Sequence, residues 1–114
     1  MSASEEAERR TAERKSLRTR ATLLLGQTQA FEVRTLDLAT GGMGIVAQAN
    51  PKPGTLMVIR FQLPIKPVGY APVEARAKVV HSVYSASEQG FKIGLAFTEL
   101  RPDMAAAVLR YLQP

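Results

Sequence analysis

The sequence predicts a mainly β protein, a six-stranded antiparallel barrel followed by one α-helix. Apolar and polar residues alternate with period two in several short segments, which is typical of half-buried strands. Glycine, proline and small polar residues separate these segments, and helical spacing appears only near the C-terminus. A chain of 114 residues suffices for one domain with its own core. Short strands joined by turns favour a closed or nearly closed barrel.

The expected strands follow one another with a turn signal after each. Glycine tolerates positive φ, so the Gly-rich run 41–44 is expected to be a turn. Prolines and glycines mark a turn at 50–54 and a loop at 64–72, and a polar stretch at 85–90 connects the last two strands. The six strands are expected at residues 21–25, 31–36, 45–47, 56–63, 73–84 and 91–97.

The C-terminal segment has the features of a helix. Pro102 suits a first helical turn, and Asp103 is favourable at the positive end of the helix dipole. An apolar stripe at helical spacing would cover one barrel mouth or contact a partner. The stripe consists of Met104, Val108, Leu109 and Leu112.

The N-terminal segment carries much of the positive charge. Residues 1–8 are small or acidic without periodicity and are expected to be disordered. Residues 9–18 form a flexible basic arm, either extended or turned into a short helix. The net charge is +5, and guanidinium groups bind phosphate oxygens well, so the arm suits a phosphate-bearing partner. A solvated basic tail is the alternative.

Several classes of function are not expected. The chain has no cysteine, and its single histidine, His81, lies in an expected strand without a second histidine nearby, which argues against a metal site or catalytic base. We therefore expect no enzyme and no cofactor. No apolar run is long enough to cross a bilayer, and the N-terminus is acidic where a signal peptide is basic, so a cytoplasmic protein without membrane insertion is expected.

Two short motifs stand on either side of the first two expected strands. The first is an Arg-x-x-x-Arg pair, Arg10 and Arg14, directly preceded by Arg9. The second is the run Asp-Leu-Ala-Thr-Gly-Gly at 37–42. Arg14 and Arg18 form another Arg-x-x-x-Arg pair, but the glutamate before it would repel phosphate, so the earlier register is preferred.

In their order and spacing, these motifs resemble the PilZ domain family. That family has an Arg-x-x-x-Arg element before its barrel and an (Asp/Asn)-x-Ser-x-x-Gly element after the second strand. The stretch 91–100 also looks like the family's last strand. The resemblance covers residues 8–113 and implies a single domain at 9–114, a PilZ-type β-barrel with a C-terminal α-helix, and a bacterial origin.

The resemblance implies that the ligand is cyclic di-GMP. Arginines of the arm would pair with its phosphates or its guanines, and Asp37 would accept hydrogen bonds from a guanine. In the family, an arginine at the place of Arg9 is associated with a stacked ligand dimer. A turn residue that stabilises its own loop is the alternative for Asp37. The expected ligand-binding residues are Arg9, Arg10, Arg14, Asp37, Ala39, Gly41 and Gly42, with Arg18 and Thr40 as accessory contacts.

One position departs from the family pattern. Ala39 stands where the family has serine, which removes one hydrogen bond worth about 0.5–1.5 kcal/mol. Thr40 could supply a hydroxyl in its place. The departure predicts weakened rather than abolished binding.

The resulting expectation is a monomeric receptor that signals through a separate protein. Cyclic di-GMP would order the arm against the barrel and change the surface offered to that partner, in motility, exopolysaccharide export or pilus regulation. The alternatives are a degenerate PilZ adaptor that binds proteins without nucleotide, favoured by Ala39, and a barrel that binds nucleic acid through its arm. Because aromatic residues are scarce, nucleic acid is not the expected partner.

Overall fold

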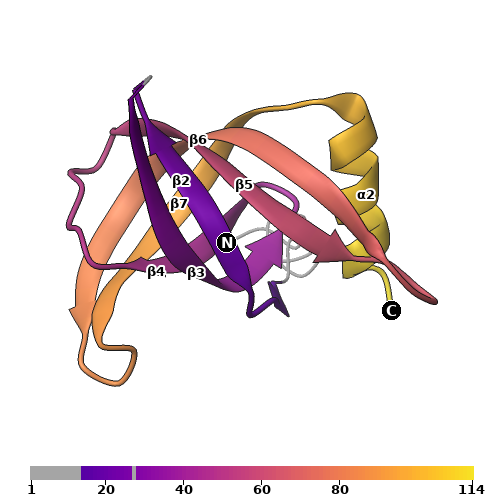
Figure 1. Ribbon diagram of the computed structural model, residues 1–114, viewed down its shortest axis with the longest axis horizontal. Coiled ribbons are helices and arrows are strands. Elements are labelled where there is room, and N and C mark those ends of the chain that lie inside the picture. Colours follow the sequence, from indigo (N-terminus) through magenta and orange to yellow (C-terminus); the bar gives the residue numbers. More distant parts are fainter. Residues whose placement is uncertain (1–13, 27) are drawn as a thin grey trace, which may run out of the picture.

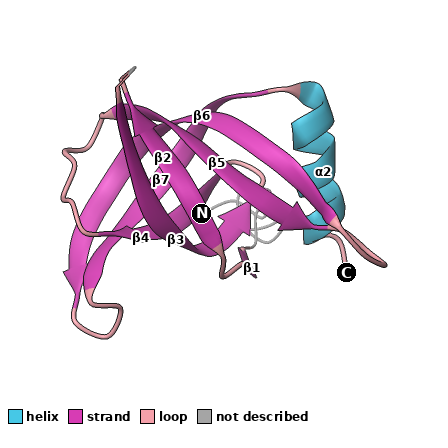
Figure 2. Ribbon diagram, viewed as in Figure 1, coloured by secondary structure: helices cyan, strands magenta, loops and turns pink. Residues whose placement is uncertain are grey.

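The computed structural model describes residues 14–26 and 28–114, and it confirms the mainly β class with one C-terminal helix (Figure 2). The predicted disorder at 1–8 and the arm residues 9–13 lie outside the described residues. The elements are β1 (Lys15–Ser16), β2 (Arg20–Leu25), β3 (Gln29–Ala39), β4 (Gly42–Ala47), β5 (Leu56–Pro64), β6 (Tyr70–Ser85), β7 (Gly90–Leu100) and α2 (Pro102–Leu112).

The strands form one antiparallel sheet that closes on itself (Figure 1). Its order is β1-β3-β2-β5-β6-β7-β4, and the additional pairing of β3 with β4 joins the two sides into a ring. Strands β2 to β7 make the predicted six-stranded barrel, and β1 is an extra short strand on the edge of β3. Closure leaves few unpaired strand edges, which is how small barrels avoid pairing with other chains.

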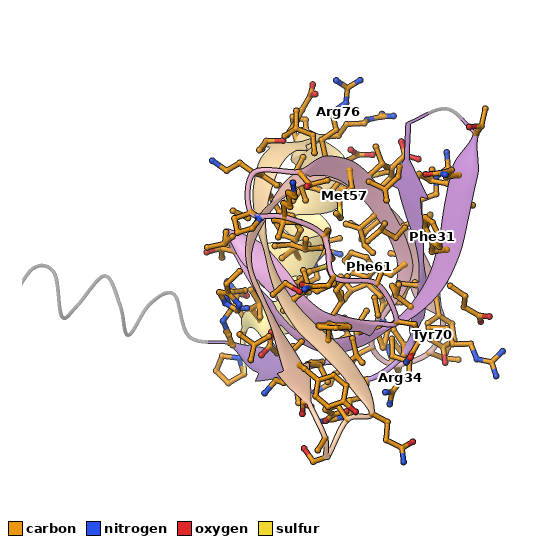
Figure 3. The ribbon with its side chains drawn as sticks, turned by 90° about the vertical axis from the view of Figure 1, so that its left-hand side faces the viewer. Phe31, Arg34, Met57, Phe61, Tyr70 and Arg76 are labelled. Atoms are coloured by element: carbon orange, nitrogen blue, oxygen red, sulfur yellow. The ribbon has the colours of Figure 1, made fainter. Side chains whose placement is uncertain are left out.

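The barrel interior is filled by the apolar residues of the alternating strands. In β5, Met57, Ile59, Phe61 and Leu63 are buried, whereas the polar residues between them are exposed. Figure 3 shows Met57 and Phe61 inside the barrel, with the charged group of Arg76 on β6 outside it. The period-two pattern thus fixes which face of each strand is available for a ligand: the charged side chains lie on the outer face, and Thr35 is the buried polar residue of the described chain.

Residues 14–19 run alongside β3 in extended form, so the extended alternative holds for this part of the arm. β1 and β2 lie end to end along the same side of β3. In the gap between them, the buried hydroxyl of Thr35 donates to the carbonyl of Leu17 and accepts from the N–H of Thr19. These bonds satisfy backbone groups that no strand pairing reaches.

Helix α2 covers one end of the barrel, and the β6–β7 hairpin projects at the other (Figure 1). Val108 is buried, and Met104 and Leu112 pack against the core, as the predicted stripe requires. Leu109 is 51% exposed, so it does not belong to the packed face. Tyr111 also holds β1: its hydroxyl donates to the Ser16 carbonyl at 2.9 Å. No helix in the described part of the chain is long and apolar enough to cross a membrane.

Strand β6 is longer than its sequence pattern indicates. It begins at Tyr70, so the connection to β5 is shorter than the expected loop at 64–72. Pro72 lies within the strand, opposite Gln62 of β5. Proline was interpreted as a loop signal here, but neighbouring cross-strand pairs continue the ladder on both sides of it.

Candidate ligand-binding site

The two sequence motifs meet at Asp37. The guanidinium of Arg14 donates from Nη1 to Asp37 Oδ1 at 2.9 Å, and the Gly44 N–H donates to the same oxygen at 2.9 Å. The side chains of Arg14 and Asp37 are 49% and 34% exposed, so this is a surface ion pair. Exposed pairs contribute about 0–1 kcal/mol, so Arg14 can exchange this carboxylate for a phosphate at little cost.

A second oxygen of Asp37 is available for a ligand. Within the described parts of the chain, no side chain or N–H binds Asp37 Oδ2. A carboxylate oxygen accepts hydrogen bonds only, which suits the amino and imino groups on the Watson–Crick edge of a guanine. Because Asp37 also closes a local loop with Gly44, both readings of this residue, the structural and the ligand-binding one, are compatible with its contacts.

Of the glycines of the second motif, Gly42 is needed for space, and neither Gly41 nor Gly42 is needed for positive φ. The expected turn is shorter than 41–44, since only Thr40 and Gly41 lie between β3 and β4. None of Gly41, Gly42 and Gly44 has a positive φ, so the predicted reason for the cluster is wrong. A Cβ atom on Gly42 would lie 2.0 Å from the Leu95 carbonyl oxygen. Gly42 therefore lets β4 approach β7.

The remaining residues of the turn differ in exposure. Ala39 is 6% exposed and pairs with Gly42 across the turn. Thr40 and Gly41 are exposed, and the Gly41 carbonyl accepts from the Phe97 N–H at 2.8 Å. Thr40 is thus the hydroxyl of this turn that a ligand can reach directly, whereas a side chain at 39 is largely covered.

Arg18 takes a different partner from Arg14. Its Nη1 and Nη2 both lie 3.2 Å from Glu88 Oε1, at the tip of the β6–β7 hairpin. Arg34 also reaches this tip and donates to the Glu88 carbonyl oxygen at 2.7 Å. The hydrogen bond from Arg18, with the nearby charges of Arg34 and Lys92, lowers the pKa of Glu88 below its ordinary 4.5. The structure therefore does not bring the accessory arginine to Asp37.

Four strands contribute to a row of residues on the outer face. Asp37 of β3 pairs with Gly44 of β4, Gly44 pairs with Gly94 of β7, and Gly94 pairs with His81 of β6. We call these four residues the glycine row. Its two central positions have no side chain, so the side chains of Asp37 and His81 lie over Gly44 and Gly94.

Sequence reasoning missed His81 and Gly94 as parts of this surface. Each end of the glycine row follows a register shift, between Thr35 and Asp37 in β3 and between Val79 and His81 in β6. Such bulges re-aim side chains and are common next to functional sites. A clue present in the sequence is a glycine inside an alternating strand, which marks close approach of another group.

Of the other expected ligand-binding residues, Arg9 and Arg10 lie outside the described residues. Those that the structure describes fall into two groups. The first group lies just before β1, at the end of β3, in the β3–β4 turn and at the start of β4, and consists of Arg14, Asp37, Ala39, Thr40, Gly41 and Gly42. The second is Arg18, which points to the β6–β7 hairpin.

Comparisons with known proteins bear on the family and the fold. A family model described as PilZ domain matches residues 8–113. Among curated proteins, none matches the sequence. Among solved structures, the Bacillus subtilis Inhibitor of motility (MotI/DgrA) is similar, with a TM-score of 0.78 and 16% identity over 88% of this chain and 47% of that chain.

Two further similar structures are complexes with c-di-GMP. The Borreliella burgdorferi PlzA protein has a TM-score of 0.60 and 14% identity over 95% of this chain and 37% of its own. The PilZ domain of YcgR from Escherichia coli has a TM-score of 0.61 and 16% identity over 90% of this chain and 87% of its own. The chain thus spans less than half of the MotI and PlzA chains, and identities this low show the shared fold alone.

Proposed function

This chain belongs to the PilZ domain family, and we propose that it is a receptor for cyclic di-GMP. The observation that carries the proposal is the contact of Arg14 with Asp37, since it joins the arginine motif to the second motif on the outer face of the barrel. Similar structures, PlzA and the PilZ domain of YcgR, are complexes with c-di-GMP. That likeness supports the choice of ligand.

In this proposal, each end of the contact has a complementary role. Arg14, with Arg9 and Arg10 of the same motif, neutralises ligand phosphate, because a guanidinium pairs with two phosphate oxygens at once. Asp37 takes the donor groups of a guanine. A ligand that carries both phosphate and guanine therefore matches the site better than phosphate alone. The full set of contacts comprises Arg9, Arg10, Arg14, Asp37, Ala39, Gly41 and Gly42, with Arg18 and Thr40 as accessory residues.

The chain would act as a switch and not as an enzyme. Residues 9–114 form one domain in this proposal, and ligand binding draws the arm towards the barrel. The Ser16 carbonyl already accepts from Tyr111 of α2, so a movement of the arm reaches the helix. A separate protein in the cytoplasm then recognises the altered surface. We assign no cofactor to this function.

Calorimetric titration of the full chain with cyclic di-GMP tests the proposal. Removing the guanidinium in Arg14→Ala removes charged hydrogen bonds worth about 1.5–3 kcal/mol, so the Kd is expected to rise roughly 10-fold to 150-fold. Arg20→Ala is the matched control, because Arg20 is an exposed arginine whose partner, Glu32, lies outside the two motifs. The stoichiometry distinguishes one bound ligand from a stacked dimer.

The alternative function is an adaptor that binds proteins without nucleotide. Ala39 favours it, because the alanine cannot supply the hydroxyl of the family's serine. Absence of heat from the unaltered chain at high ligand concentration would reject the receptor and leave the adaptor. Binding of RNA or DNA would instead show a steep loss of affinity with salt, from counterion release.

A further inference from the structure

Within the glycine row, the imidazole of His81 lies flat on Gly94. A Cβ atom at Gly94 would be 2.5 Å from His81 Nε2, 2.7 Å from Cε1 and 3.0 Å from Cδ2. A point in the ring plane beyond Nε2 would be much farther from the two carbons bonded to Nε2 than from Nε2 itself. A point above the ring face is nearly as close to these carbons as to Nε2. The three similar distances therefore place that Cβ position above the face of the ring. One face of the ring therefore rests on Gly94, where any other residue would put a side chain.

The opposite face of the ring points away from the sheet. Gly94 is buried beneath the imidazole, and His81 itself is exposed. No other described side chain forms a hydrogen bond or ion pair with His81, and no group of histidine and acidic residues that could hold a metal ion occurs in the described chain. The ring is thus a small planar surface, supported from below and open above.

The position of this surface connects it to Asp37. Asp37 Oδ1 lies 2.8 Å from the Cβ position of Gly44, just as His81 Nε2 lies 2.5 Å from that of Gly94. The two glycines are cross-strand partners. Cβ positions of such partners are about 5 Å apart, so the carboxylate and the imidazole are at most about 11 Å apart. A ligand held by Asp37 therefore lies within reach of the ring.

We propose that His81 stacks against one purine base of the ligand bound at Asp37. Histidine is one of the aromatic side chains on which nucleic-acid bases stack. The bulge between Val79 and His81 turns the ring onto the outer face, and Gly94 leaves room for it to lie flat. This inference rests on the proposed function, because the base belongs to cyclic di-GMP.

A proton NMR titration with cyclic di-GMP tests the stacking directly. The chain has a single histidine, so its ring protons give one isolated set of signals. A purine stacked on the ring shields these protons, and their signals are expected to move upfield as the site fills. Unmoved signals under conditions where calorimetry shows bound ligand would overturn the stacking.

Substitutions separate stacking from a purely structural role. His81→Ala is expected to weaken binding about 5-fold to 150-fold, as loss of one base–aromatic stack does. His81→Phe keeps a ring and is expected to retain most of the affinity. Tyr70→Ala is the matched control, because Tyr70 is an aromatic residue on the same strand, 68% exposed, at the end that pairs with Pro64. Thermal unfolding of each variant confirms that it folds.

The outcomes also separate this inference from the proposed function. If the unaltered chain binds no cyclic di-GMP, the receptor itself is wrong. If the unaltered chain binds and His81→Ala binds equally well, only the stacking is wrong. The stacking is also wrong if His81→Phe weakens binding as much as His81→Ala does.

Discussion

The two ends of the glycine row have the same local geometry, but one is formed by residues close in sequence and the other by residues of two long paired strands. Asp37 and His81 each follow a bulge and lean over a glycine of the neighbouring strand. Asp37 meets Gly44 within one tight hairpin, only seven residues along the chain. His81 meets Gly94 through the long β6–β7 pairing. The Asp37 end is thus a local motif, whereas the His81 end exists only through strand register.

The two ends also differ in chemistry. At the Asp37 end, a carboxylate and the guanidinium of Arg14 supply charge and directed hydrogen bonds. At the His81 end, the surface is a flat ring on a glycine. Directed bonds distinguish guanine from other bases, while stacking tolerates any base. In the proposed receptor, base specificity would therefore come from the β3–β4 side and additional affinity from the β6–β7 side.

The largest effect is expected from a substitution that forces apart β4, which carries the glycine under Asp37, and β7, which carries the glycine under His81. Gly42 of β4 packs against the Leu95 carbonyl oxygen of β7, where a Cβ atom would lie at 2.0 Å. Since the obstacle is backbone, Gly42→Ala is expected to cost about 3 kcal/mol, as overpacking does. For a domain of this size, that lowers the Tm by about 10–20 °C. Thermal unfolding followed by circular dichroism measures it.

The neighbouring glycine is the control. A Cβ atom on Gly41 would have no atom within 4 Å, and its φ is not positive. Gly41→Ala is therefore expected to change the free energy of unfolding by no more than about 0.5 kcal/mol. Equal losses in Tm for the two variants would show that the β4–β7 approach is not what requires Gly42.

The sequence predicts the features that local patterns encode, and it does not predict those that strand register creates. Period-two alternation predicted the six-stranded barrel, because burial of one strand face is encoded residue by residue. The arginine pair and the Asp37 turn are likewise contiguous motifs. A glycine inside the strand 91–97 indicates close approach of some group, but that this group is His81 was not predictable, because it depends on bulges and a pairing register that no local pattern encodes. Positive φ was expected at Gly42. Its close contact with β7 could not be predicted either, because that contact also depends on how distant strands pair.

A second prediction sharpens the chemistry of the Asp37 end. Ala39→Ser restores the hydroxyl of the family pattern and is expected to tighten cyclic di-GMP binding by one hydrogen bond, up to roughly 10-fold. Titration calorimetry beside the unaltered chain measures the change. Thr40→Ala is the companion variant, since Thr40 already carries an exposed hydroxyl in the same turn.

The result of Ala39→Ser depends on where its hydroxyl points. The side chain at 39 is 6% exposed, so a hydroxyl that finds neither ligand nor backbone partner would be buried unsatisfied. Unchanged affinity together with a lower Tm would contradict the prediction. Loss of affinity in Thr40→Ala would then show that the Thr40 hydroxyl, and not a side chain at 39, supplies the hydrogen bond to the ligand.

The smallest expected effect concerns the β6–β7 side, where Glu88 binds Arg18 and Arg34. The Glu88 side chain is 18% exposed, and its pKa lies below the ordinary 4.5, chiefly because of the hydrogen bond from Arg18. A lowered pKa in the folded state means that the ionised carboxylate favours folding above pH 4.5 and that this contribution disappears as the pH falls through the lower, folded value. Glu88→Gln keeps the side-chain size and removes the charge.

The Tm of Glu88→Gln is therefore expected to lie slightly below that of the unaltered chain at pH 6, and the gap is expected to close as both are acidified. Glu32→Gln is the control, because Glu32 forms an exposed pair with Arg20 at 3.6 Å. A gap that persists at acid pH would contradict the role of the charge. Since a neutral amide holds Arg18 less strongly than a carboxylate does, tighter cyclic di-GMP binding by Glu88→Gln would also show that the hairpin competes with the ligand for this arginine.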